Sequence, residues 1–155
     1  MLSLPVTMKE QSFTVAFSVD QSPQQVFDAI NNVRGWWTGS IEGSTDKLGE
    51  TFTYRYKDFH RSHHKIAELV PGQRIAWETT DASLGSFENK AEWIGTRVVF
   101  DIAKKGDRTE VHFTHVGLVP RFQCYGDCSG AWGFFVGESL RSLITTGKGM
   151  LPPED

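Results

Sequence analysis

Hydrophobic and polar residues alternate along much of the chain, and a helical period replaces this alternation near the end. Phe13, Val15, Phe17 and Val19 alternate with small residues, which is typical of a strand with one buried face. From 132 to 144 the apolar positions recur every three or four residues, which indicates an amphipathic helix. One side of this helix carries Trp132, Val136, Leu140 and Leu143, with Phe135 and Ser139 beside them.

A short helix is predicted directly after the first strand. Ser22 supplies an N-cap, Pro23 suits the first helical position, and Gln25 completes a capping box. This helix should end near 31–32, and the glycines that bound 33–39 predict a second short helical turn. The buried stripe of the first of these helices would consist of Val26, Phe27 and Ile30.

The middle of the chain predicts a series of antiparallel strands. Residues 50–57 place three aromatic side chains on one side of a strand, and 60–70 form the next strand. The segments 71–72 and 104–107 are typical of turns, and 80–92 is expected to be looser. The predicted inward rows are Phe52, Tyr54 and Tyr56; Ile75, Trp77 and Thr79; Thr96, Val98, Phe100 and Ile102; and Val111, Phe113 and His115.

This order of elements predicts an α+β fold in which a mostly antiparallel sheet grips one long C-terminal helix. The 155 residues, 39% of them hydrophobic, suffice for one core and are few for two. We therefore expect a single domain over 1–155, with its core at about 12–149. Because such an architecture encloses a space between sheet and helix, we also expect an apolar binding cavity.

Composition and charge exclude several classes of function. A formal net charge of -3 gives no general attraction to nucleic acid or anionic lipid. The first residues lack the features of a signal peptide, and no segment approaches the ~18 apolar residues of a membrane span, so we expect a soluble, cytoplasmic protein. The sequence has no Gly-x-Ser-x-Gly elbow, no glycine-rich phosphate loop and no His-Glu-x-x-His motif, so nucleophilic catalysis finds no support.

The clustered histidines and cysteines do not predict a metal site. On a strand, His60 and His64 share one face with their Cα atoms about 13 Å apart, while His63 points to the other face. We interpret these histidines as part of a solvated strand face. Cys124 and Cys128 are too few for a disulfide framework, and we interpret them as reduced, structural thiols buried against the last helix.

The first half of the last helix is rich in glycine. Gly126, Gly130, Gly133 and Gly137 trace one helical stripe, and each costs about 0.5–1 kcal/mol relative to alanine. Either the helix merely tolerates these residues, or they allow a close approach of another backbone or a bend. If the helix bends, the segment 121–130 would form one wall of a ligand gate.

Several short motifs occur in a fixed order along the chain. They are Ser22–Ile30 followed by Trp36 and Trp37, then Gly95 and Thr96, Thr114–Leu118, Trp132, and Thr146–Gly149. In this order they resemble the START-like (SRPBCC) superfamily and, within it, the family named for the C-terminal domain of the activator of heat shock protein ATPase homologue. The resemblance implies a helix-grip fold, similar to that of birch pollen allergen, with a curved sheet, a long C-terminal helix and a hydrophobic tunnel between them.

The resemblance also implies a function, because members of this superfamily bind lipids, sterols, polyketides or other apolar molecules. We therefore expect a small hydrophobic ligand as the partner, with no cofactor and no metal. Two alternatives remain open: an enzyme similar to polyketide cyclases with His115 as general base, and an interaction module for a chaperone or another protein. An open sheet would also allow a homodimer through an edge strand.

The inward aromatic residues provide the candidate ligand contacts. Most inward rings pack the core, but tyrosine and tryptophan can also orient a polar substituent through their O–H or N–H groups. His115 is either a structural histidine with hydrogen-bond partners or a polar anchor for the ligand. The candidate ligand-binding residues are Trp36, Trp37, Tyr54, Tyr56, Trp77, Phe100, Phe113, His115, Phe122, Cys128 and Trp132.

Overall fold

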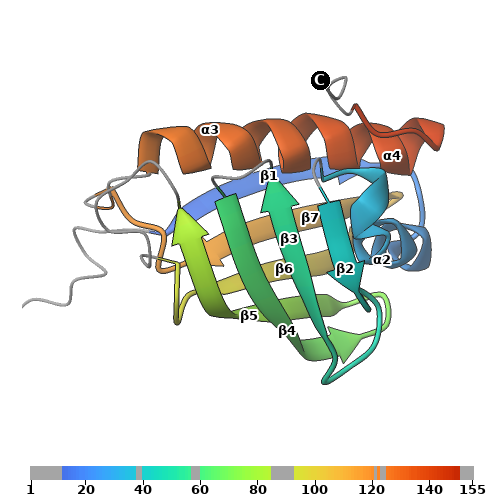
Figure 1. Ribbon diagram of the computed structural model, residues 1–155. Coiled ribbons are helices and arrows are strands. Elements are labelled where there is room, and N and C mark those ends of the chain that lie inside the picture. Colours follow the sequence, from blue (N-terminus) through green and yellow to red (C-terminus); the bar gives the residue numbers. More distant parts are fainter. Residues whose placement is uncertain are drawn as a thin grey trace, which may run out of the picture.

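The computed structural model describes residues 12–37, 40–56, 60–84, 93–120, 122 and 125–150. One antiparallel sheet of seven strands dominates the fold, and the C-terminal helical segment lies across one face of it (Figure 1). This is the helix-grip arrangement that the sequence predicted. The strand order across the sheet is β1 (Phe13–Val19), β7 (Arg108–Val116), β6 (Arg97–Lys105), β5 (Arg74–Leu84), β4 (His60–Val70), β3 (Thr51–Tyr56) and β2 (Ser40–Gly43).

Alternation along the strands buries one face of the sheet. In β7, Val111, Phe113 and His115 are fully buried, while the side chains between them are exposed or half-buried. The register pairs Phe100 of β6 with Phe113, so the buried rows continue from strand to strand. The inward rows predicted within 52–56, 75–79, 96–102 and 111–115 are confirmed.

Two parts of the strand prediction were incomplete. The segment expected to be loose from 80 begins as strand, because β5 continues to Leu84 along the long strand β4. An ion pair of 2.9 Å between Arg61 and Asp81 joins the two strands there. The short edge strand β2 carries no apolar alternation and was not predicted. Residues 85–92, Arg121 and Cys124 lie outside the described residues.

The helix α2 (Pro23–Asn31) has the predicted capping box. Ser22 Oγ accepts a hydrogen bond from the Gln25 backbone N–H at 3.2 Å, and the Gln25 side chain accepts one from the Ser22 N–H at 2.9 Å. The 3-10 turn η1 (Val33–Gly35) follows, and it directs Trp36 and Trp37 into the core. The predicted stripe Val26, Phe27 and Ile30 is buried.

The C-terminal helix has three parts: α3 (Tyr125–Phe134), the π-helical segment η2 (Phe135–Leu140) and α4 (Arg141–Thr146). An α-helix has about 3.6 residues per turn, so side chains four positions apart drift around its axis. The wider π turn corrects this drift, because it holds about one extra residue. Across the three parts of the C-terminal helix, buried side chains therefore recur every four residues. They are Cys128, Trp132, Val136, Leu140 and Ile144.

The π segment also corrects one predicted position. A continuous α-helix would direct Leu143 into the core, as the sequence predicted. In the structure Leu143 is half-buried and packs against the core, and Ile144 belongs to the core itself. The extra residue in the π turn shifts every later inward position by one.

The glycines of α3 face open space. A Cβ atom at Gly126, Gly130 or Gly133 would have no described atom within 4 Å, and one at Gly137 would lie 3.6 Å from Val15. A close approach of the sheet therefore does not explain the first three glycines.

None of the helices in the described ranges has the length and apolar character that crossing a membrane requires.

The residues after α4 pack against the end of η1, at Gly35 and Trp36. Ser139 Oγ donates a hydrogen bond to the Trp36 carbonyl at 2.8 Å and accepts one from the Met150 N–H at 2.9 Å. A Cβ atom at Gly149 would collide with the Gly35 carbonyl oxygen and lie 3.0 Å from Ser139 Oγ. Only glycine fits this crossing without a shift of the backbone.

Replacing Gly149 with alanine is therefore expected to lower the free energy of unfolding by about 1–3 kcal/mol, the usual cost of an overpacked site. The matched control is Gly130→Ala, which adds the same methyl group in open space within a helix. This control should raise the free energy of unfolding by about 0.5–1 kcal/mol. Urea unfolding followed by tryptophan fluorescence measures both effects, and equal stability of the two variants would contradict the assigned crossing.

Candidate functional site

All five tryptophans of the chain are buried between the sheet and the C-terminal helix. Trp36 and Trp37 follow η1, Trp77 lies in β5, Trp93 precedes β6, and Trp132 lies in α3. The Trp36 Nε1–H donates a hydrogen bond to the Ile30 carbonyl at 3.1 Å, which fixes that ring at the end of α2. Residues far apart in the sequence thus build a single aromatic interior.

The rings of this interior contact one another directly. Trp37 stacks on Tyr54 with 3.8 Å between ring centroids and lies 4.9 Å from Trp132. Pairs of this kind add about 0.5–1.5 kcal/mol each beyond the burial of their surface. Among the candidate ligand residues, Tyr56 and Phe122 are partly exposed, and both pack against the edge of the core. The other candidates, His115 and Cys128 included, are buried.

His115 makes hydrogen bonds through both ring nitrogens. The Trp132 Nε1–H donates to its Nδ1 at 3.0 Å, and its Nε2 lies 2.8 Å from Thr96 Oγ1. Because an indole N–H can only donate, Nδ1 is the unprotonated nitrogen and Nε2 carries the proton. Thr96 Oγ1 in turn donates to the Trp93 carbonyl at 2.6 Å. The imidazole thereby connects α3 to the turn before β6.

This geometry favours the neutral form of His115. Burial lowers the pKa of His115 to about 3. A second proton would have to sit on Nδ1, where it would face the Trp132 N–H. A role as general base would therefore require the bond to Trp132 to break, and the observed arrangement instead suits a structural histidine.

His60 and His64 face the interior, so the predicted solvated strand face is wrong for these two residues. His64 is fully buried, with Nε2 2.8 Å from Ser62 Oγ and Nδ1 3.2 Å from Thr79 Oγ1. Burial lowers the pKa of His64 well below its usual value and that of half-buried His60 to about 4. His64 and Ser62 can be buried because their imidazole and hydroxyl groups, together with the hydroxyl of Thr79 in β5, satisfy one another.

Trp93 was missing from the sequence-based candidates. Its side chain is buried, with 3% exposed. Its ring stacks on Trp132 with centroids 5.8 Å apart and lies edge to face with His115, with centroids 4.7 Å apart. Trp93 lies in a turn, so strand periodicity could not find it. The available signal was its position three residues before Thr96, the first residue of a predicted inward row.

Three nitrogen atoms of the aromatic interior are buried without a hydrogen-bond partner among the described residues. They are Nε1 of Trp77, Nε1 of Trp93 and Nε2 of His60. Most buried polar atoms in folded proteins have a partner, and one that lacks it costs about 1–3 kcal/mol. Such atoms indicate positions where a bound molecule could supply the missing bond.

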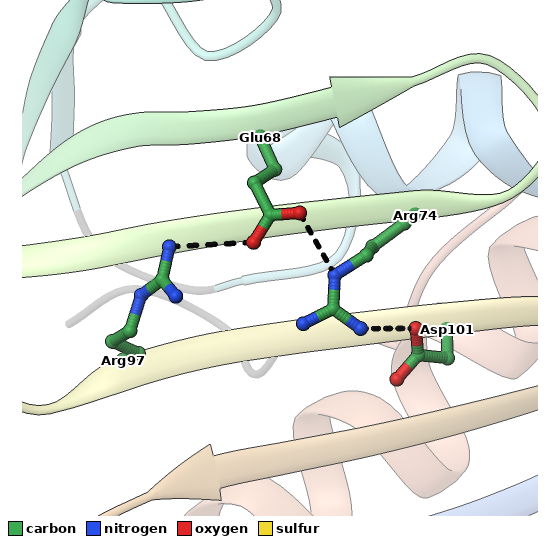
Figure 2. A network of polar contacts seen from close by, with 4 residues as sticks. All are labelled: Glu68, Arg74, Arg97 and Asp101. Carbon is green, nitrogen blue, oxygen red and sulfur yellow. Dashed lines mark hydrogen bonds and ion pairs between the residues drawn. The ribbon is translucent and has the colours of Figure 1, made fainter.

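Charged side chains lie on the opposite face of the sheet. Figure 2 shows Glu68 between Arg97 and Arg74, with Asp101 beyond Arg74. The Glu68 contacts measure 3.1 Å to Arg74 Nε and 3.4 Å to Arg97, and Arg74 lies 2.6 Å from Asp101. These side chains are about a third to a half exposed, so the ion pairs add little stability.

The interior itself carries no formal charge in the described ranges. The buried polar residues found there are threonines, serines and histidines. Over the same ranges, histidine, cysteine and acidic side chains form no group that could hold a metal ion. The arrangement can therefore offer ring stacking and neutral hydrogen bonds to a bound molecule.

Comparison with known proteins identifies the family. The family described as Activator of Hsp90 ATPase homolog 1-like protein matches residues 20–145. The chain belongs to this family. The Activator of Hsp90 ATPase homolog 1-like assignment agrees with the resemblance noted in the sequence, and no curated protein matches the chain.

Solved structures with this family's fold include proteins of low sequence identity. The Aha1 dimer from Colwellia psychrerythraea has a TM-score of 0.71 and 23% identity, over 89% of this chain and 98% of that one. CalU16 from Micromonospora echinospora has a TM-score of 0.62 and 15% identity, over 88% and 77%. DynU16, a protein in the dynemicin biosynthetic locus, has a TM-score of 0.61 and 17% identity, over 88% and 48%. Identities this low support the fold alone.

Proposed function

We propose that this protein binds a small, uncharged hydrophobic molecule between the sheet and the C-terminal helix. The ligand class is a lipid, a polyketide or an aromatic metabolite. Flat rings line the interior, and its described polar residues are neutral. An apolar interior with a few polar groups is the usual character of a small-molecule site.

The observation that carries this proposal is the group of unpartnered nitrogen atoms next to half-buried aromatic residues. His60 and Trp93 each have one such atom, and their rings touch with centroids 5.0 Å apart. Tyr56, which pairs with His60 across β3 and β4, is half-buried. A ligand that enters beside Tyr56 would reach the unpartnered atom of His60 without crossing the whole core.

Two alternatives have less support. A cyclase-like reaction has less support because both ring nitrogens of His115 are engaged in hydrogen bonds within the protein. An interaction module would be expected to expose a large apolar patch. The described residues offer five exposed large hydrophobic side chains for such a patch: Leu48, Val70, Ile94, Val116 and Met150.

The proposal is tested by titrating the protein with N-phenyl-1-naphthylamine, an uncharged fluorescent probe. We expect saturable binding with Kd in the micromolar range, that is about 8 kcal/mol, together with quenching of the buried tryptophans. The matched control is 8-anilinonaphthalene-1-sulfonate, the same ring system with a sulfonate group. It should bind at least about tenfold more weakly, because an interior without charge cannot compensate a buried anion.

Two results would overturn the proposed function. One is the absence of saturable quenching by the uncharged probe. The other is equal affinity for the two probes, which would indicate adsorption to the surface.

A further inference from the structure

Of the three unpartnered nitrogen atoms in the interior, those of His60 and Trp93 belong to rings that contact each other, with centroids 5.0 Å apart. Trp93 is 3% exposed, and its Nε1–H is buried without a partner. His60 meets it edge to face, at 78° between the ring planes, and the buried Nε2 of His60 is also unpartnered. By contrast, both nitrogens of His64 and both of His115 are engaged within the protein.

We propose that Trp93 and His60 form a polar subsite that binds the oxygen of an uncharged aromatic ligand, of the class of fused-ring ketones. The Trp93 N–H donates to the ligand oxygen, and the His60 nitrogen provides the second polar contact. This inference rests on the proposed function, since it names the ligand class for the same interior. It adds a chemical requirement that a purely apolar tunnel would not impose.

The surroundings of the subsite account for the aromatic part of the ligand. Trp93 is stacked near Trp132 at 14° between ring planes, and Tyr54 meets His60 edge to face at 5.1 Å. Flat rings can pack against such walls in stacked or edge-to-face geometry, whereas a flexible chain gains less from them. Rigid polycyclic molecules also lose little conformational freedom on binding.

The chemistry of the two nitrogens accounts for the oxygen. An indole N–H is only a donor, so its partner has to be an acceptor. A neutral imidazole nitrogen can donate or accept, so it tolerates a carbonyl as well as a hydroxyl group. Because the described interior has no opposite charge, an ionised carboxylate would be unfavourable there and a neutral ketone suits the site better.

The test compares 9-fluorenone with fluorene, two molecules of the same shape that differ by the carbonyl oxygen. Each is used to displace N-phenyl-1-naphthylamine from the wild-type protein, from Trp93→Phe and from His60→Phe. The ratio of the two affinities isolates the contribution of the oxygen. We expect the affinity for 9-fluorenone relative to fluorene to fall about five- to tenfold in Trp93→Phe, which corresponds to one lost hydrogen bond. The same ratio should also fall in His60→Phe.

The matched control is His63→Phe, which makes the same replacement on the other face of β4. His63 contacts Thr53 Oγ1 at 2.6 Å and takes no part in the interior. The affinity ratio should remain at the wild-type value in this variant. If Trp93→Phe does not fold, His60→Phe carries the test alone.

The outcomes separate this inference from the proposed function. If the probe binds and the ratio is the same in wild type, Trp93→Phe and His60→Phe, the subsite is wrong and the general function stands. That result would mean that water satisfies the two nitrogens. If the probe does not bind the wild-type protein at all, the proposed function itself fails.

Discussion

Lowering the pH from 6.5 to 4.5 is expected to cost this protein much of its free energy of unfolding. Burial lowers the pKa of His60 to about 4 and that of His115 to about 3, and it lowers the pKa of His64 well below its usual value. Below pH 6.5 the unfolded chain binds protons that the folded protein excludes, so the folded state loses stability as the pH falls. Three such histidines give a loss of about 4 kcal/mol per pH unit, which within two units rivals the usual total of about 5–15 kcal/mol.

Urea unfolding at several pH values between 7 and 4.5 measures this slope. His60→Phe should reduce it by about one third, since one of three buried imidazoles is removed. His112→Gln is the control, because His112 is exposed on the outer face and its removal should change the slope much less than His60→Phe does. The carboxyl pKa values of Asp81 and Glu110 are lowered by hydrogen bonds to Arg61 and His112, so these groups act mainly below this window. A free energy of unfolding that stays constant from pH 7 to 5 would refute the burial of the three imidazoles.

Replacing His115 with phenylalanine is expected to lower the free energy of unfolding by about 2–4 kcal/mol. The new ring would fill similar space but would leave the Trp132 N–H without its acceptor and Thr96 Oγ1 without its donor. Each unsatisfied buried group costs about 1–3 kcal/mol. Chemical unfolding monitored by circular dichroism provides the measurement.

A double-mutant cycle with Trp132→Phe isolates the bond between the two side chains. Once Trp132 has lost its N–H, the His115→Phe change should cost less, so the two effects should not add. His112→Gln again serves as the surface control and should stay within about 0.5 kcal/mol of wild type. Strict additivity would argue against the direct hydrogen bond and the histidine tautomer that it implies.

Much of the fold could be predicted from sequence because its signals are local. The alternation in β1, β3, β6 and β7 and the capping box of Ser22 and Gln25 depend on neighbouring residues, and these predictions are confirmed. The prediction for Leu143 was only partly right, because the π turn, which depends on how the whole helix packs on the sheet, leaves Leu143 half-buried against the core and buries Ile144 instead. Local periodicity contains no information about that choice.

The candidate site was predictable only in part. The buried rings of Tyr54, Trp77 and Trp132 were among the candidates, because each lies at an inward position of a regular element, where large rings are usually buried. His60 and His64 were assigned to solvent, because the contacts that accompany their burial include groups distant in sequence: Thr79 of β5 bonds His64, and the ring of Trp93 packs against His60. Trp93 was not predicted as a site residue, because it lies between β5 and β6, outside any element with a periodic pattern.

The π segment between Phe135 and Leu140 bears on how relatives of this protein should be aligned. A π turn of this kind is equivalent to one residue inserted into an α-helix and accommodated without a loop. A relative with one residue fewer in this segment would keep the same buried surface. If its sequence were aligned to this one without a gap, the residue placed opposite Leu143 would be the structural counterpart of Ile144. Correct alignment of the two helices therefore needs a single-residue gap within the helix, where gaps are ordinarily penalised most.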